Sequence, residues 1–234
     1  MKSTSFWLAV GLALASADAL AQKTTPIPAA PPASPPAAVS AVPPAASAAL
    51  ARAVALYGDG AAHVSAFTQV YTPSGFATAR RESGTVVIEV PQRVRFDYTA
   101  PEKKVFTYDA GEGRFFSPDD KQLTVRRLSE EEKARLPIVF LTQPADLGRQ
   151  YEIAVEPGEA ASPTRILLTP RVPRPDLAWL RLAIDGEGKV SGLSYQDSAG
   201  NRTEFRFESW RAEKARPAAD FRITGPPGTR IVEN

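Results

Sequence analysis

Apolar and polar residues alternate along the stretch from Ser83 to Pro101, and this alternation predicts two β-strands joined by a tight turn. Pro91 ends the first strand because proline fixes φ and has no amide hydrogen to donate to a neighbouring strand. Successive side chains of a strand point to opposite faces. The predicted apolar face carries Val86, Ile88, Val90, Val94, Phe96 and Tyr98, and the opposite, solvated face carries Glu89, Arg93, Arg95 and Asp97.

Further short strands follow at regular intervals, separated by turns rich in Gly, Pro and Asp, and this pattern predicts an antiparallel meander. Because the right-handed twist of so many strands accumulates, we expect a mainly β fold: an incomplete antiparallel β-barrel, or half-barrel, covered by short helices. The expected strands span residues 63–71, 104–108, 114–117, 122–126, 150–155, 164–169, 179–185, 189–196, 201–210 and 220–224.

Two segments have the pattern of helices that would cover the apolar face. In residues 48–57, Leu50, Val54 and Tyr57 recur at helical spacing among alanines. Ser129 and Glu132 have the spacing of a capping box at the start of a second helical segment. Pro137 interrupts that segment, so two short helices set at an angle are expected to form a flap. The apolar residues of this flap are Leu136, Ile138, Val139, Phe140 and Leu141.

The N-terminal region divides into two parts that precede the predicted domain. Residues 1–21 have the features of a cleaved secretory signal peptide, namely a basic start at Lys2, an apolar run and the small-residue site Ala19–Ala21. The apolar run is shorter than the roughly 20 residues that span a membrane. Residues 22–47 are mostly Ala, Pro, Ser and Val and are expected to form a disordered spacer. The folded domain is expected to cover residues 48–234.

Composition narrows the possible functions. The chain has no cysteine, which excludes disulfides, thiolate metal sites and cysteine nucleophiles. Its net charge of +2 gives no electrostatic reason to expect nucleic-acid binding. The single histidine, His63, lacks a flanking serine or carboxylate motif, and the acidic clusters fit a turn and a helix start. We therefore expect no enzymatic activity and no metal or cofactor.

The large apolar face of the hairpin agrees with two interpretations. In the first, it is the core of a small β-domain that the helices close. In the second, it is one wall of a cavity that binds an apolar ligand, as the mouths of barrels often do. The residues alone leave both interpretations open.

Several short motifs occur in an order and spacing that resemble one known family. They are Phe67-Thr68-Gln69, Ser83-Gly84, Asp109-Ala110-Gly111, Tyr151-Glu152-Ile153, Leu182 to Gly188, and Phe221 followed by Pro226-Pro227-Gly228-Thr229. Across residues 48–231 the chain resembles the LolA family of periplasmic outer-membrane lipoprotein carriers. The resemblance implies a half-barrel with a helical lid, whose cavity takes the acyl chains of a lipoprotein.

The resemblance also implies partners and a binding site. A carrier of this family receives acylated lipoprotein cargo from an inner-membrane lipoprotein-release ABC transporter and passes it to an outer-membrane lipoprotein receptor; we expect a monomer. Each buried methylene of an acyl chain contributes about 0.8 kcal/mol to binding. The acyl cavity is expected to be lined by Val86, Ile88, Val90, Val94, Phe96, Tyr98, Phe106 and Phe116, and the lid to include Leu50, Val54, Leu136, Ile138, Val139, Phe140 and Leu141.

One position departs from the pattern of the family. Typical members have an arginine immediately before the proline that ends the first hairpin strand, where it helps to hold the lid shut, whereas this chain has Val90. By alternation, Arg93 and Arg95 face away from the lid. Together with the long spacer, this difference leaves a second function open: a half-barrel sensor or docking module of an envelope lipid or glycolipid export system.

Overall fold

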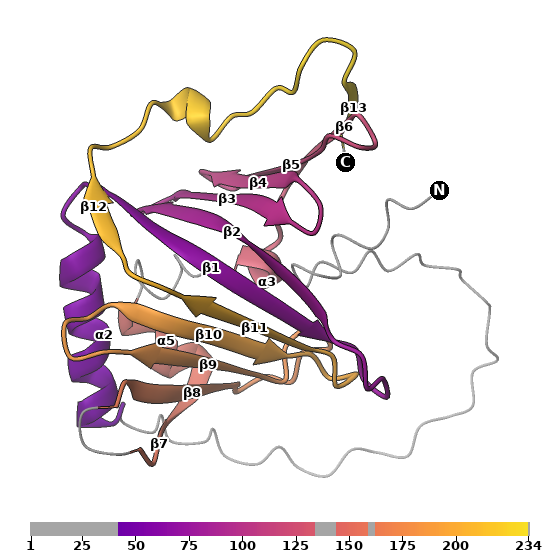
Figure 1. Ribbon diagram of the computed structural model, residues 1–234. Coiled ribbons are helices and arrows are strands. Elements are labelled where there is room, and N and C mark those ends of the chain that lie inside the picture. Colours follow the sequence, from indigo (N-terminus) through magenta and orange to yellow (C-terminus); the bar gives the residue numbers. More distant parts are fainter. Residues whose placement is uncertain (1–41, 134–143, 159–161, 234) are drawn as a thin grey trace, which may run out of the picture.

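The structure is a computed structural model that describes residues 42–133, 144–158 and 162–233. Within these ranges it contains a large curved sheet and a few short helices (Figure 1). The helices are α2 (Pro44–Tyr57), α3 (Glu130–Lys133), α5 (Pro144–Gln150) and the 3-10 helix η1 (Ala218–Asp220). The strands are β1 (Ala62–Thr72), β2 (Arg80–Glu89), β3 (Arg93–Ala100), β4 (Lys104–Asp109), β5 (Glu112–Ser117), β6 (Gln122–Arg127), β7 (Tyr151–Glu156), β8 (Thr164–Pro170), β9 (Trp179–Ile184), β10 (Val190–Gln196), β11 (Arg202–Phe207), β12 (Arg211–Glu213) and β13 (Arg230–Glu233).

All the strands belong to one open sheet. Neighbouring strands follow the order β13-β6-β5-β4-β3-β2-β1-β11-β10-β9-β8-β7, and β12 pairs with β1 outside this order. Most neighbours are consecutive in the chain and antiparallel, as expected of a meander, whereas β13 pairs with β6 in parallel. The sheet curls without its edge strands β13 and β7 becoming neighbours, so the predicted incomplete barrel is confirmed (Figure 1).

The hairpin predicted around Pro91 is formed by β2 and β3. Val86 lies opposite Phe96, and Ile88 lies opposite Val94. All four side chains are buried in the main core, on the concave face of the sheet, which we call the inner face. Along β3 the buried residues alternate with half-buried ones. The alternation predicted from the sequence is therefore confirmed for β3, whereas Val86 to Glu89 of β2 are all buried.

Two glycines allow close approaches that fix the shape of the sheet. Gly84 lies at a bulge between β2 and β3, where a Cβ would be only 1.9 Å from the carbonyl oxygen of Asp97. Gly188 has a φ of +88°, and a Cβ there would be 2.7 Å from the backbone of Arg52 in α2. Any larger residue at either position would push the strands or the helix apart.

Helix α2 covers part of the inner face with its apolar stripe. It begins at Pro44, earlier than expected, so residues 44–47 are helical and do not belong to the spacer. Proline suits the start of a helix because its missing amide hydrogen would have no partner there. Val54 is only half-buried. The buried stripe consists of Ala46, Ala49, Leu50, Ala53 and Tyr57, and the helix contacts β7, β8, β9 and α5.

The capping box predicted after β6 is present. The Ser129 amide donates to Glu132 Oε2 at 2.9 Å, and the Glu132 amide donates to Ser129 Oγ at 3.2 Å. The expected lid residues Leu136, Ile138, Val139, Phe140 and Leu141 lie outside the described residues, as do the expected signal peptide and residues 22–41 of the spacer. No helix in the described ranges has the length and apolarity needed to cross a membrane.

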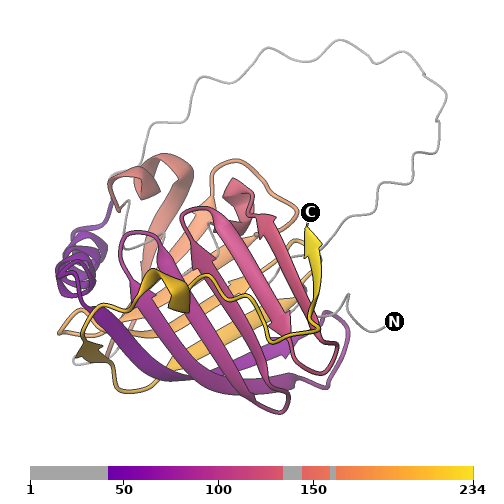
Figure 2. The ribbon, with the colours of Figure 1, turned by 90° about the horizontal axis from the view of Figure 1, so that it is seen from above.

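The C-terminal region differs most from the expectation. The strand predicted over residues 201–210 ends earlier, at Phe207, as β11, and a separate short strand, β12, follows it and pairs with an earlier part of β1 than β11 does. No strand forms at residues 220–224: Asp220 ends η1, and residues 221–224 continue as an irregular segment. Residues 214–229, which we call the strap, instead cross the convex outer face of β2 to β5 and lead to β13 (Figure 2). The sequence pattern of the strap gave no indication of this parallel pairing.

Candidate functional site

The inner face is dominated by aromatic rings that join the two halves of the sheet. The ring of Phe67 on β1 contacts those of Phe96 and Tyr98 on β3 at centroid distances of 5.2 and 5.0 Å, both nearly perpendicular. Phe205 on β11 lies 5.8 Å from Phe96 and is stacked on Phe207. Such edge-to-face contacts favour a defined arrangement of the rings. The inner face therefore has a continuous apolar floor across β1, β3 and β11.

Most of the apolar residues expected on this face lie there. Leu50 of α2 belongs to the same core. Val90 is partly buried and packs against it, so the position at which the family pattern has an arginine is an apolar contact in this chain. The expected cavity residues buried in the main core are Val86, Ile88, Val94, Phe96, Tyr98 and Phe106.

Phe116 does not lie on the inner face. Its neighbour Phe115 is buried there, opposite Phe106. Phe116 therefore points to the outer face, where it lies opposite Val105 and Leu123. Adjacent residues of a strand face opposite ways. The sequence analysis assigned Phe116 to the inner face, whereas Phe115 lies there.

At one end of the inner face, side chains from α2, β1 and the segment after β11 meet the start of β10. Tyr57 Oη accepts a hydrogen bond from the amide of Val190 at 3.1 Å, and Trp210 Nε1 donates to the carbonyl oxygen of Val190 at 2.6 Å. Burial raises the pKa of Tyr57 far above its ordinary value. His63 is 2% exposed, lies edge-on to Tyr57 and has Nε2 2.9 Å from Asp59 Oδ1. His63 therefore packs against the C-terminal end of α2.

The inner face also contains a group of buried polar residues that the sequence analysis missed. Lys104 Nζ lies 2.5 Å from Glu82 Oε1, and these two residues are 4% and 2% exposed. Tyr98 Oη donates to Gln69 Oε1 at 2.7 Å, and Lys104 Nζ lies 4.7 Å from the centre of the Tyr98 ring. We call Gln69, Glu82, Tyr98 and Lys104 the polar cluster. In the sequence, Glu82 and Lys104 stand near strand ends and look like solvated residues.

Burial shifts the pKa values of Lys104 and Tyr98 in the polar cluster. It lowers the pKa of Lys104, and the hydrogen bond and charge of Glu82 act in the opposite direction. Burial also raises the pKa of Tyr98 well above its ordinary value. The same oxygen of Glu82, Oε1, also contacts Arg80, whose Nη2 lies 2.8 Å away and whose side chain is 38% exposed. The cluster thus reaches from the apolar floor to the rim of the sheet.

The outer face of the same strands holds the strap by hydrogen bonds from arginines. Arg95 forms two 2.7 Å contacts with the carboxylate of Asp97 and donates from Nη1 to the carbonyl oxygen of Asp220 at 2.6 Å. Arg114 Nη1 donates to the carbonyl oxygen of Ile223 at 3.0 Å. The prediction that Arg95 faces away from the apolar face is confirmed, and its partner is the strap.

The outer face of the hairpin is not solvated as expected. Glu89 is only 7% exposed and accepts a hydrogen bond from the amide of Arg216 in the strap. Phe221, also in the strap, is 1% exposed and forms a second small core with Val64 and Val87. At Val87 and Glu89 the outer face of the hairpin is therefore buried too, because the strap covers a face that the sequence analysis predicted to be solvated.

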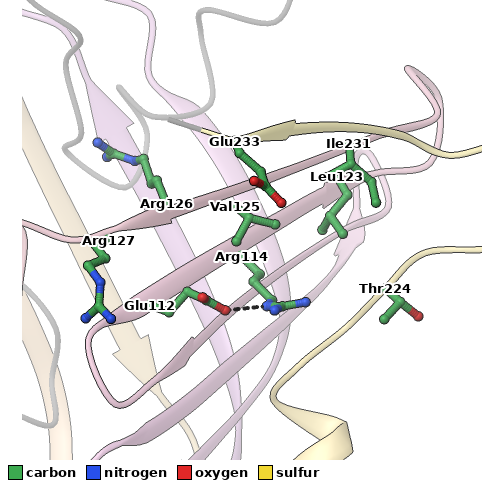
Figure 3. A pocket seen from close by; sticks show the side chains of 9 residues that line it. All are labelled: Glu112, Arg114, Leu123, Val125, Arg126, Arg127, Thr224, Ile231 and Glu233. Atoms are coloured by element: carbon green, nitrogen blue, oxygen red, sulfur yellow. Dashed lines mark hydrogen bonds and ion pairs between the residues drawn. The ribbon is translucent and has the colours of Figure 1, made fainter.

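A groove of about 320 Å³ follows the junction between β5, β6 and the C-terminal segment (Figure 3). Arg114 lines this groove, pairs with Glu112 at 2.7 Å and also holds the strap. Leu123, Val125 and Ile231 supply its apolar part. The groove is thus the outer boundary between the sheet and the segment that covers it, and it lies on the face opposite the aromatic floor.

Comparison with known proteins identifies relatives of most of this domain. The family described as "Outer membrane lipoprotein carrier protein LolA" matches residues 61–224. A protein of Xanthomonas campestris named outer-membrane lipoprotein carrier protein is 30% identical over 168 residues, which are 71% of this chain and 79% of that protein. A protein of the same name from Methylibium petroleiphilum is 28% identical and covers 72% of this chain and 81% of its own length.

A solved structure shows the same fold at low sequence identity. An uncharacterised conserved protein from Thermus thermophilus superposes with a TM-score of 0.53 at 10% identity, covering 81% of this chain and 99% of that one. This likeness concerns the fold alone. The matched residues 61–224 are more than half of the chain and include β1 to β12 with the first part of the strap. On this match and on the 30% identity to the Xanthomonas protein, the chain belongs to the LolA family.

Proposed function

We propose that this protein is a periplasmic carrier that binds the acyl chains of lipoproteins against its inner face and transfers them from the inner to the outer membrane. The observation that supports this most is the continuous aromatic floor of Phe67, Phe96, Tyr98 and Phe205 in a sheet that stays open. An open sheet allows a ligand to exchange contacts with such a floor. The relatives' name, outer-membrane lipoprotein carrier protein, indicates the same class of cargo.

The energetics suit a reversible carrier. Each methylene of an acyl chain contributes about 0.8 kcal/mol when it leaves water for an apolar face, so a soluble protein can hold several chains without a covalent bond. Under this proposal the cargo arrives from an inner-membrane lipoprotein-release transporter and leaves to an outer-membrane lipoprotein receptor. Binding and release then need neither a cofactor nor a reaction.

A pair of phenylalanines provides the test. Phe96 is 4% exposed on the inner face, whereas Phe76 is 70% exposed in the β1–β2 connection. Phe96→Glu places a charge on the aromatic floor and is expected to weaken binding of a fluorescent acyl probe by at least about tenfold, because a charge in an apolar site is costly. Phe76→Glu is the matched control and should bind as the unaltered protein does.

Native mass spectrometry of the protein purified from the exporting cell complements this measurement. Co-purifying lipoprotein or lipid is expected with the unaltered protein and with Phe76→Glu, and should be lost with Phe96→Glu. Circular dichroism confirms that each variant is folded. If the unaltered protein retains no lipid and takes up no probe, the carrier function is rejected.

Val90 supports a second candidate, a sensor or docking module of an envelope lipid or glycolipid export system. Val90 is partly buried against the core, at the position where typical family members have an arginine. A docking module would keep a protein partner in pull-down experiments with Phe96→Glu, since the partner would bind elsewhere. A carrier would lose its cargo in the same variant.

A further inference from the structure

We propose that the outer face of β8 to β11 is a docking surface for an extended, acidic segment of a partner protein. A hollow of about 450 Å³ lies on this face, and its charged lining consists of Glu156, Arg165, Arg181, Arg202, Glu204 and Arg206. The strap crosses β2 to β5 and does not reach these strands (Figure 1). Since the hollow and the aromatic floor lie on opposite faces, this inference goes beyond the proposed carrier function.

Small side chains form the floor of the hollow. Arg165 of β8 lies opposite Ala183 of β9, Ala183 lies opposite Gly192 of β10, and Gly192 lies opposite Arg206 of β11. Along this row, only a methyl group and a hydrogen atom lie between the two long side chains. The two arginines are three strand spacings apart, which is about 14 Å. The row is thus a shallow channel across the strands, with an arginine at each end.

The fold of the chain itself does not require a glycine at position 192. Gly192 lies beside an irregularity in the pairing of β9 and β10, but its φ is outside the left-handed region. A Cβ there would be 3.6 Å from Ala183 Cβ and from the carbonyl oxygen of Phe205, which are ordinary contact distances. Glycine weakens a strand, and it often marks a place where a ligand or another backbone approaches closely. An approaching segment accounts for a glycine that keeps the hollow open.

Two of the arginines are held in place by the chain itself. Arg181 Nη2 lies 2.6 Å from Glu156 Oε1, and Arg202 forms an ion pair with Glu204. Both guanidinium groups also lie near the ring of Trp179, at 4.9 and 5.7 Å from its centre. A side chain that is already fixed loses less entropy when a partner binds. These residues therefore give the hollow walls of defined shape.

The other two arginines supply positive charge that the chain does not neutralise. Arg165 and Arg206 are exposed, and within the described ranges their side chains form no hydrogen bond or ion pair. Carboxylates suit them, because the fork of guanidinium donors matches the two carboxylate oxygens. In an extended segment, side chains four residues apart point the same way and are also about 14 Å apart. Two acidic residues at this spacing would therefore reach both arginines at once.

Two features favour a protein segment over an anionic lipid surface. Glu156 and Glu204 place negative charges among the arginines and would repel a uniformly anionic membrane, whereas a protein can place neutral or basic side chains opposite them. The outer face is also convex, so a flat bilayer would contact only a small part of it (Figure 2). The pattern of charge therefore fits a partner that is acidic at defined positions.

The test uses the isotope-labelled full chain and a terminally blocked peptide, Glu-Thr-Ser-Thr-Glu. In nuclear magnetic resonance spectra the peptide is expected to shift the amide signals of Arg165, Ala183, Gly192 and Arg206. In the double variant Arg165→Gln/Arg206→Gln, the Kd of the peptide should rise by about tenfold, the factor expected from the loss of two exposed ion pairs. A peptide with adjacent acids, Glu-Glu-Thr-Ser-Thr, should bind the unaltered chain more weakly, because it cannot reach both arginines.

A matched control separates the hollow from net charge. The double variant Arg52→Gln/Arg81→Gln removes the same charge from two exposed arginines that do not line the hollow, and it should bind the peptide as the unaltered chain does. If both double variants lose the same affinity, the binding depends on net charge alone and the inference is overturned.

Gly192→Gln tests the shape of the hollow without changing its charge. Because a Cβ fits at this position, the variant is expected to fold, which circular dichroism verifies. Its side chain would occupy the floor between the two arginines, so the peptide should bind it as weakly as it binds the Arg165→Gln/Arg206→Gln variant. Undiminished binding by folded Gly192→Gln would place the peptide elsewhere and overturn the inference.

Other occupants of the hollow are further outcomes that overturn the inference. One is that vesicles of phosphatidylglycerol, but not the peptide, bind in a manner that requires Arg165 and Arg206. Another is a dimer in size-exclusion chromatography that the Arg165→Gln/Arg206→Gln variant loses. Failure of the unaltered chain to bind the peptide has the same consequence. Binding of the acyl probe, measured on the same samples, reports separately on the carrier function.

Discussion

The two faces of strands β2 to β5 are both covered, the inner one mainly by apolar packing and the outer one by a small apolar core around Phe221 together with hydrogen bonds to the strap. On the inner face, Val86, Phe96 and Phe115 pack with other apolar side chains. On the outer face, Arg95 and Arg114 hold the strap by hydrogen bonds to its carbonyl groups. Apolar contacts are non-directional and can be replaced by those of an acyl chain, whereas hydrogen bonds to a backbone require one geometry. One face is therefore suited to exchange its contacts and the other to keep them.

The largest expected effect on stability is a difference between two adjacent residues, Phe115 and Phe116, that lie on opposite faces of the sheet. Phe115→Ala removes a ring that is 6% exposed on the inner face and is expected to lower the free energy of unfolding by about 3–5 kcal/mol. Phe116→Ala removes a half-buried ring on the outer face and should cost about 1 kcal/mol. Urea denaturation of both variants measures the difference. Equal losses would contradict the assignment of the two rings to opposite faces.

An intermediate effect is expected where the strap is held. Arg95→Ala removes a hydrogen bond to Asp220 and the pair with Asp97, and should cost about 1–2 kcal/mol. The loss should be local, so amide hydrogen exchange is expected to increase in residues 217–224 more than in β1 to β4. Arg181→Ala is the control, since its pair with Glu156 lies on a part of the outer face outside the strap's contacts. Faster exchange of the strap in both variants would argue against the specific role of Arg95.

The smallest effect concerns the helix end of the inner face and depends on pH. The folded-state pKa of Tyr57 is raised above its unfolded value of 10.0, so its contribution to stability is fully present below about pH 10 and is lost as the pH rises further. Tyr57→Phe should cost about 1 kcal/mol at neutral pH, because the Val190 amide loses its acceptor. The variant should also lose less stability than the unaltered protein as the pH rises from about 10 to about 12. Thermal unfolding measured across this range would refute the prediction if both proteins showed the same slope.

Local pattern was enough to predict the hairpin and the capping box. Alternation in β3 separated Phe96 from Arg95 because each residue type has a clear preference for one environment. The capping box of Ser129 and Glu132 depends only on residues three apart. Features that one segment determines by itself can be read from the sequence in this chain.

The sequence predictions were wrong where the environment of a residue depends on segments far away in the chain. Phe115 and Phe116 are equally apolar, so only the pairing with β4 and β6 decides which one faces inward. Glu89 looks solvated until the strap, more than a hundred residues later, covers it. The polar cluster joins Gln69, Glu82 and Lys104 from separate strands, and all three are buried although each is polar.

The strap is longer than the distance that it has to bridge. It starts after β12, which pairs with β1, and ends at β13, which pairs with β6. Its residues could extend over roughly 50 Å, whereas the five strand spacings from β1 to β6 amount to about 24 Å. Because the strap is longer than this distance, tension does not hold it in place. If its hydrogen bonds open, the strap stays tethered at both ends and can rebind at a high effective concentration.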